Sequence, residues 1–122
     1  MEAEKATVLM KADPIYAEGQ ETSKENKDLF LYNRFFIRFS LDPEIKGDEP
    51  LPYAKEMVDM LLAIPSRDRG QTARLLMGYE YLMRFEYFYN KNKKGAIAIA
   101  EKMLGMDPAR QAAKQFVSIL SK

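Results

Sequence analysis

The side chains that could carry chemistry in this chain are carboxylates, because its sequence contains no histidine and no cysteine. Histidine-assisted triads, cysteine nucleophiles and thiolate or imidazole metal sites are therefore excluded. One carboxylate pair, Glu56 and Asp59, has the i, i+3 spacing that places two residues on one helix face. That face is expected to meet water, which gives neither group the surroundings of a general acid. No glycine-rich phosphate loop is present either, so we predict no enzyme activity, no catalytic residues and no cofactor.

Arg34 and Arg38, one helical turn apart, form a second pair of charged residues. Like charges at i, i+4 destabilise a helix slightly unless an acid satisfies them. A carboxylate of a partner protein would do so through charge-assisted hydrogen bonds. Asp28 or the acidic loop at residues 42–50 would do so from within the chain. Both alternatives stay open from the sequence.

The loop that begins at Asp42 partly matches a calcium-binding loop, with acids at its first and third positions and Gly47 at its sixth. The match fails further along. Lys46 takes a ligand position, and Tyr53 stands at the twelfth position, where a bidentate glutamate is required. We therefore predict no metal site.

Basic residues are balanced by acidic ones, with 19 lysines and arginines against 18 aspartates and glutamates and a net charge of +1. Such a chain lacks the long-range field of a dedicated nucleic-acid or membrane-surface protein. Lys91, Lys93 and Lys94 form a small basic turn that could touch phosphate, although a solvated turn needs no such explanation and is favoured. A nucleic-acid-binding domain that uses this turn and arginines 34, 38, 67, 69 and 74 is the weakest of our alternatives.

The chain of 122 residues is long enough for one domain with its own core, which we place at residues 1–122. No apolar run approaches the roughly 18 residues needed to cross a bilayer, and the acidic N-terminus does not resemble a signal peptide. We expect a soluble protein with no membrane contact. A cytoplasmic setting is favoured, and the mature part of an exported protein or a piece of a longer solenoid remains open.

Apolar-rich segments punctuated by proline and glycine predict an all-α fold with about six helices. We place these helices near residues 2–12, 24–41, 50–64, 68–90, 94–106 and 107–120. Ser66 is a candidate cap for the fourth, and the Asp107-Pro108 pair is expected to end the fifth and open the sixth. The apolar stripe of the sixth is expected to cover the fifth. Short connections favour antiparallel hairpins.

Aromatic residues crowd the second and fourth predicted helices. On the fourth, four of them lie at i, i+4, i+7 and i+8 along one face, namely Tyr81, Phe85, Phe88 and Tyr89. This spacing fits a buried core stripe, and it also fits the wall of a binding groove. We expect Phe85 to be at least partly buried, and Tyr81 and Tyr89 to be the more accessible members.

Residues 96–108 place Ala96, Ala100, Met103 and Leu104 before an Asp107-Pro108 pair. This pattern resembles the second helix of a tetratricopeptide repeat. Small residues allow close helix approach, larger apolar ones fill the space beyond, and an Asp-Pro pair ends the helix. The resemblance is best over residues 77–108 and is carried by Tyr87, Ala96, Ala100, Met103, Leu104 and Pro108. Glu80, Met83 and Arg84 stand where the family has Trp, Leu and Gly. The resemblance implies a right-handed superhelix of hairpins, and these departures leave a compact helical bundle as the alternative.

In that family the first helices of the hairpins line a groove that binds other proteins. The sequence therefore predicts a non-enzymatic interaction scaffold that recognises a peptide, a helix or a second copy of itself through an aromatic face. The candidate binding residues are Arg34, Arg38, Tyr81, Phe85, Phe88 and Tyr89. The alternative is a structural or capping module of a longer solenoid, with no ligand of its own.

Overall fold

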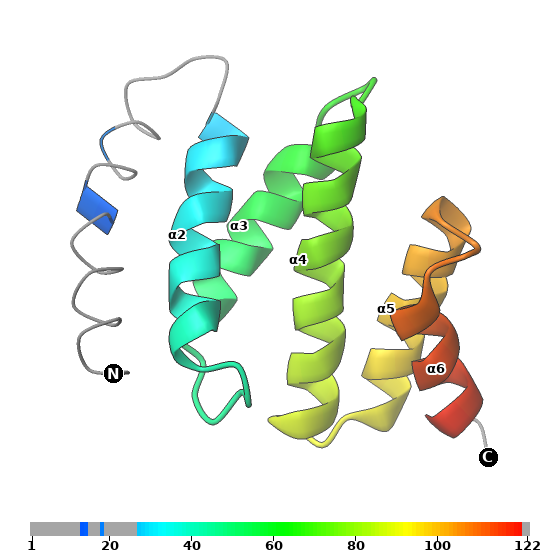
Figure 1. Ribbon diagram of the computed structural model, residues 1–122. Helices are drawn as coiled ribbons and strands as arrows, with labels where there is room; N and C mark the ends of the chain where they lie inside the picture. The colour runs from blue at the N-terminus through cyan, green and yellow to red at the C-terminus, as the bar shows by residue number, and fades with distance from the viewer. Residues whose placement is uncertain (1–12, 15–17, 19–26, 121–122) are drawn as a thin grey trace. The chain divides into compact units, whose positions relative to one another are not determined.

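The computed structural model describes residues 13, 14, 18 and 27–120, and within them it contains five α-helices and no strand (Figure 1). The helices are α2 (Lys27–Leu41), α3 (Leu51–Leu62), α4 (Arg69–Phe88), α5 (Lys93–Met106) and α6 (Gln111–Leu120). The all-α prediction is confirmed. The helix predicted for residues 2–12 lies outside the described residues.

The chain forms two compact units, residues 1–65 and 66–122. In the first unit α2 packs against α3. Leu31 and Phe35 of α2 and Met57 and Leu61 of α3 are fully buried, so each helix presents one apolar face to the core. Pro52 lies in the first turn of α3, where a missing backbone N–H costs no helical hydrogen bond.

The loop between α2 and α3 is held by its own backbone rather than by an ion. The Asp42 carboxylate accepts hydrogen bonds from the backbone N–H groups of Lys46 and Gly47, at 2.9 and 2.8 Å. Ile45 has a φ of 56°, which is unusual for a β-branched residue, and its side chain is buried. Burial of Ile45 offsets the strain of this conformation, so the loop has a defined shape.

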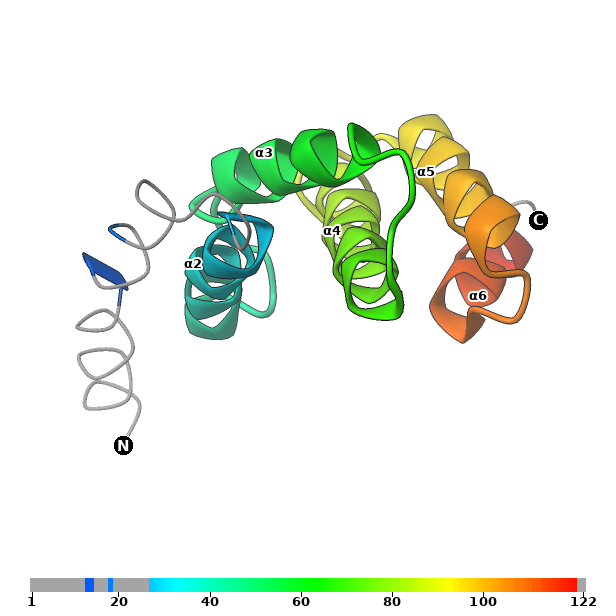
Figure 2. The same cartoon turned by 90° about the horizontal axis from the view of Figure 1, so that it is seen from above.

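The second unit consists of α4, α5 and α6, with α5 in contact with both of its neighbours (Figure 1 and Figure 2). Ala96, Ala100 and Met103 of α5 are fully buried, in keeping with the close approach expected of the small residues. On α6, Ala113 is buried, while Phe116 and Val117 are half-buried. None of the helices in the described part of the chain has the length and apolar character that crossing a bilayer requires.

One predicted helix cap and one predicted helix start are wrong. The residue that caps α4 is Asp68, not Ser66: its side chain accepts from the backbone N–H of Gln71 at 2.7 Å, and the Gln71 side chain accepts from the backbone N–H of Asp68 at 3.0 Å. This reciprocal pair satisfies two N–H groups that the helix itself leaves unbonded. The Asp107-Pro108 pair ends α5 without opening α6, which begins at Gln111 after a turn closed by the Arg110 N–H to Asp107 carbonyl bond.

The cap of α4 gives a first testable expectation. Asp68→Ala should lower the free energy of unfolding by about 1 kcal/mol, because it removes the side-chain acceptor at the helix N-terminus. Ser66→Ala is the matched control and should change it by less than about 0.5 kcal/mol. Urea unfolding of both variants measures the difference. Equal effects of the two substitutions would contradict the assignment of Asp68 as the cap.

Candidate interaction surfaces

The structure divides the predicted aromatic face of α4 into a buried and an exposed half. Tyr81 is fully buried and Phe85 is 4% exposed, whereas Phe88 and Tyr89 are each 45% exposed. Partial burial of Phe85 and access to Tyr89 were expected. The accessibility expected of Tyr81 is wrong, because α4 has buried residues on several sides, including Leu75, and spacing on one face does not identify the side that meets solvent.

The two halves are joined by stacked rings. The rings of Tyr81 and Phe85 have centroids 6.0 Å apart with an interplanar angle of 30°, and those of Phe85 and Tyr89 are 4.7 Å apart at 14°. Tyr89 therefore lies at the exposed end of a row whose other members are in the core. Such support limits the rotamers of Tyr89 and reduces the entropy that it would lose on contact with a partner.

Phe88 belongs to a second cluster, which includes α6. The Tyr87 ring meets those of Phe88 and Phe116 edge-on, at 4.9 and 5.7 Å, and Phe88 and Phe116 are 6.5 Å apart at 90°. We call Tyr87, Phe88, Tyr89 and Phe116 the C-terminal aromatic patch. The sequence placed Phe116 in the stripe that covers α5 and gave no sign of its contact with Tyr87, which depends on the packing of α6.

A basic turn follows the patch directly. Lys91, Lys93 and Lys94, the lysine turn, are all exposed. The Glu86 carboxylate accepts hydrogen bonds from the side-chain amides of Asn90 and Asn92, at 3.1 and 2.9 Å. The carboxylate thus holds both asparagines in place. The backbone that carries the three lysines is therefore ordered.

The N-terminal cap of α5 also orders the backbone of the lysine turn. The Asn92 side chain also caps α5 by accepting from the Gly95 N–H at 3.0 Å. A Cβ at position 95 would collide with the Asn92 amide, which explains the glycine there. Lys91 has a φ of 56°, a conformation that glycine or asparagine adopts more readily at a helix end.

Arg34 and Arg38 bind a carboxylate of their own chain, Asp13. Arg34 Nε lies 3.1 Å and Arg38 Nη1 2.6 Å from Asp13 Oδ1. Both guanidinium groups also stack on the ring of Tyr53 in α3, at 4.9 and 3.9 Å from its centroid. Asp13 is not among the acids considered from the sequence, although Glu49 of the 42–50 loop also raises the pKa of Arg38 through its charge.

Asp13 and Arg38 shift each other's pKa. The hydrogen bond from Arg38 lowers the pKa of the Asp13 carboxyl below its ordinary value, with a further contribution from Arg34, although burial acts in the opposite direction. The same bond raises the pKa of Arg38. The Asp13 side chain is 13% exposed, so solvent and salt weaken this ion pair less than an exposed one.

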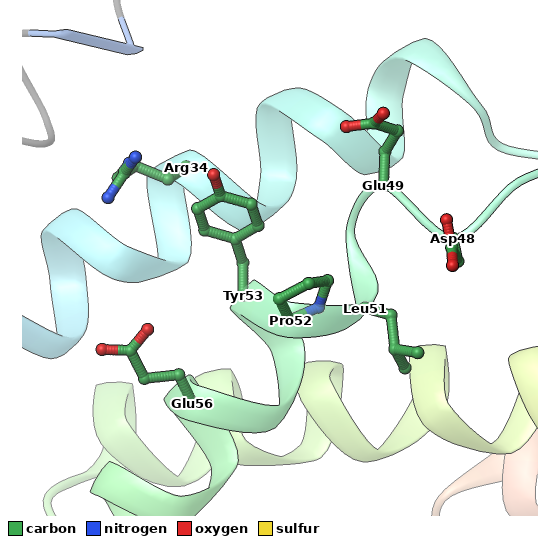
Figure 3. A pocket seen from close by; sticks show the side chains of 7 residues that line it. All are labelled: Arg34, Asp48, Glu49, Leu51, Pro52, Tyr53 and Glu56. Carbon is green, nitrogen blue, oxygen red and sulfur yellow. The ribbon is translucent and has the colours of Figure 1, made fainter.

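A solvent-open pocket of about 530 Å³ adjoins the arginines in the first unit (Figure 3). Its lining consists of Arg34, Asp48, Glu49, Leu51, Pro52, Tyr53 and Glu56. Arg34 and Tyr53 thus belong both to the Asp13 cluster and to the pocket wall. Three carboxylates on the same wall make the pocket acidic apart from Arg34.

The other charged pairs considered from the sequence lie on the helix surface. Glu80 and Arg84 are 4.0 Å apart in an i, i+4 ion pair. Glu56 and Asp59 are both exposed on α3. Within the part of the chain that the structure describes, no group of three or more acidic side chains is arranged to hold a metal ion.

Comparison of the chain with protein-family models, with curated proteins and with solved structures found no match. The likeness of residues 77–108 to a tetratricopeptide repeat therefore stays a prediction.

Proposed function

We propose that this chain is a non-enzymatic helical module that binds a segment of another protein through the C-terminal aromatic patch. The supporting observation is the pair of neighbouring aromatic side chains, Phe88 and Tyr89, each 45% exposed. Tyr89 is stacked on Phe85, and Phe88 meets Tyr87 edge-on. Large aromatic groups that are held in place and partly exposed are the usual anchors of protein interfaces. Tyr81 and Phe85 support the patch from the core and do not contact the partner.

The lysine turn defines the chemistry of that partner. Three exposed lysines directly follow the two exposed rings, so a matching segment carries acidic residues beside an apolar anchor. A polynucleotide is a poorer match, since the net charge is only +1 and Arg34 and Arg38 are engaged by Asp13. Complementary charge would speed association, while the rings would supply most of the affinity.

The structural alternative, a capping module without a ligand, is favoured by one observation. Tyr81 and Phe85, half of the predicted binding face, are buried. Under that alternative, Phe88 and Tyr89 would be covered by further repeats of a longer chain. It predicts no affinity for an acidic segment, so one binding experiment separates the two functions.

The probe is a blocked synthetic peptide that alternates acidic residues with leucine and phenylalanine, and the control peptide carries Gln and Asn in place of the acids. We expect the acidic peptide alone to perturb the amide resonances of residues 86–95. The Phe88→Ala/Tyr89→Ala variant should weaken binding by about 30-fold, the equivalent of roughly 2 kcal/mol. Lys91→Glu/Lys94→Glu should weaken it and reduce its dependence on salt.

Phe36→Ala provides the matched control, because Phe36 is 46% exposed but lies on α2 in the other unit. It should leave the dissociation constant unchanged. Equal weakening by Phe36→Ala, or an unchanged affinity of the Phe88→Ala/Tyr89→Ala variant, would count against the patch. Tighter binding of a single-stranded oligothymidylate than of the acidic peptide would favour the nucleic-acid alternative.

A further inference from the structure

The loop between α2 and α3 carries the charge that the lysine turn requires of a partner. Residues 42–50 contain four acidic residues and one lysine. That lysine, Lys46, lies 3.2 Å from Glu44, so its positive charge is matched within the loop. Asp48 and Glu49 are exposed. The loop therefore has a net negative charge, and two of its carboxylates lie at the surface, where lysines of another molecule can reach them.

Apolar groups lie beside these two carboxylates. Asp48 and Glu49 line the solvent-open pocket of about 530 Å³ together with Leu51 and Pro52. Figure 3 shows Asp48, Glu49 and Leu51 at the end of this pocket that is away from Arg34. Leu51 is half-buried and Pro52 is exposed. We call Asp48, Glu49, Leu51 and Pro52 the acidic wall. It combines acids with an apolar surface, as the proposed function requires of a partner segment.

The acidic wall and the surface made by the aromatic patch and the lysine turn are each held in shape by contacts of their own. The Leu51 N–H donates to the Asp48 carbonyl oxygen at 3.0 Å, which ties the acidic wall to the first turn of α3. On the other surface, the Tyr89 ring stacks on Phe85, with centroids 4.7 Å apart, and the Glu86 carboxylate holds the backbone of the lysine turn. Surfaces that are ordered beforehand lose little conformational entropy on association.

We propose that the partner segment belongs to a second copy of this chain, and that the acidic wall of one copy docks on the C-terminal aromatic patch and lysine turn of the other. The carboxylates of the wall pair with the lysines, and its apolar residues cover the exposed rings of the patch. The pocket beside the wall has the volume of a ligand site and has room for one ring. The contact is heterologous, because it joins two different surfaces that every copy carries. This inference rests on the proposed function, since it assigns a partner to the same patch.

Sedimentation equilibrium of the full chain tests this self-association. We expect the weight-average molar mass to rise with protein concentration. The rise should be smaller in about 0.5 M salt than in about 0.1 M salt, because salt screens the pairing of exposed charges. The acidic peptide that probes the patch should lower the mass at a fixed protein concentration, because it occupies the surface that the second copy needs. The control peptide with Gln and Asn should leave the mass unchanged.

Charge reversal on either surface makes the test specific. Asp48→Lys/Glu49→Lys places lysines opposite lysines, and Lys91→Glu/Lys94→Glu places acids opposite acids. Each variant alone should associate at least about tenfold more weakly than the unmodified chain, because like charges then face each other. An equimolar mixture of the two variants should associate again, because the reversed wall of one matches the reversed turn of the other.

Asp59→Lys/Glu101→Lys is the matched control, because it makes the same change in net charge as Asp48→Lys/Glu49→Lys at exposed positions on α3 and α5. It should associate as the unmodified chain does. Equal weakening by this control, or no recovery in the mixture, would overturn the proposal. If Asp48→Lys/Glu49→Lys does not fold, Asp48→Asn/Glu49→Gln takes its place and should also weaken association.

The same experiments separate this inference from the proposed function. A molar mass that stays at that of one chain at every concentration overturns the self-association. If the acidic peptide still perturbs the amide resonances of residues 86–95 of that chain, the patch binds acidic segments and the proposed function stands. If neither the peptide nor a second copy binds, both proposals are wrong.

Discussion

Truncation of Phe85 to alanine is expected to lower the free energy of unfolding by about 3–5 kcal/mol. The side chain is 4% exposed and its ring stacks between those of Tyr81 and Tyr89. Its removal forfeits the transfer energy of a buried ring, leaves a cavity and breaks both ring contacts. Chemical denaturation, with the slope checked for two-state behaviour, measures the loss.

Phe88→Ala is the matched control, since it removes the same atoms three residues further along the same helix. Phe88 is 45% exposed, and its measurable contribution is the contact with Tyr87 and Phe116. We expect a loss of about 1 kcal/mol, in the range of a single aromatic pair. A loss at Phe88 as large as that at Phe85 would show that the division of α4 into buried and exposed halves is incorrect.

Helix positions are predictable from this sequence because the signals that set them are local. Prolines and glycines interrupt the apolar periodicity at short intervals, and the five described helices fall where that periodicity places them. The caps are less predictable, because Ser66 and Asp68 are both good cap residues and differ only in whether Gln71 can complete the reciprocal bonds. The local pattern thus predicts where a helix lies but does not determine the residue at which it begins.

The candidate sites depend on contacts that no local pattern contains. Tyr81 and Tyr89 occupy equivalent positions two turns apart on one face, yet one is buried and the other is 45% exposed. The residue type is the same, so the difference comes from what packs around each ring. Asp13 is 21 residues from Arg34 and 25 from Arg38. Its selection among the chain's acids is a result of tertiary packing.

The Asp13 ion pair predicts a pH dependence of stability. The arginines lower the pKa of Asp13 in the folded chain below its ordinary value of 3.8. A group with a lowered folded pKa stabilises the fold fully above its unfolded pKa and loses this contribution as the pH falls through the folded pKa. We expect Asp13→Asn to be less stable than the unmodified chain by about 1.5–3 kcal/mol at pH 7, the range for hydrogen bonds to charged groups.

That difference should shrink as the solution is acidified, because protonated Asp13 is nearly isosteric with asparagine and carries no charge. It should be constant above about pH 5 and fall towards zero as the pH drops through the lowered pKa of Asp13. Unfolding curves of both chains across this range, taken at one ionic strength, measure it. Comparison of the two chains cancels the titration of the other carboxylates, which they share. Asp59→Asn, at an exposed position on α3, should differ from the unmodified chain by less than about 0.5 kcal/mol at every pH.

The shape of the Asp13→Asn profile separates charge from packing. A loss of stability that stays the same from pH 7 to pH 2 would mean that asparagine disturbs the packing around the arginines and that the ionised carboxylate contributes nothing of its own. A loss that disappears on acidification assigns the energy to the anion. In that case Arg34 and Arg38 stabilise the fold through their charge-assisted hydrogen bonds to the ionised Asp13 carboxylate.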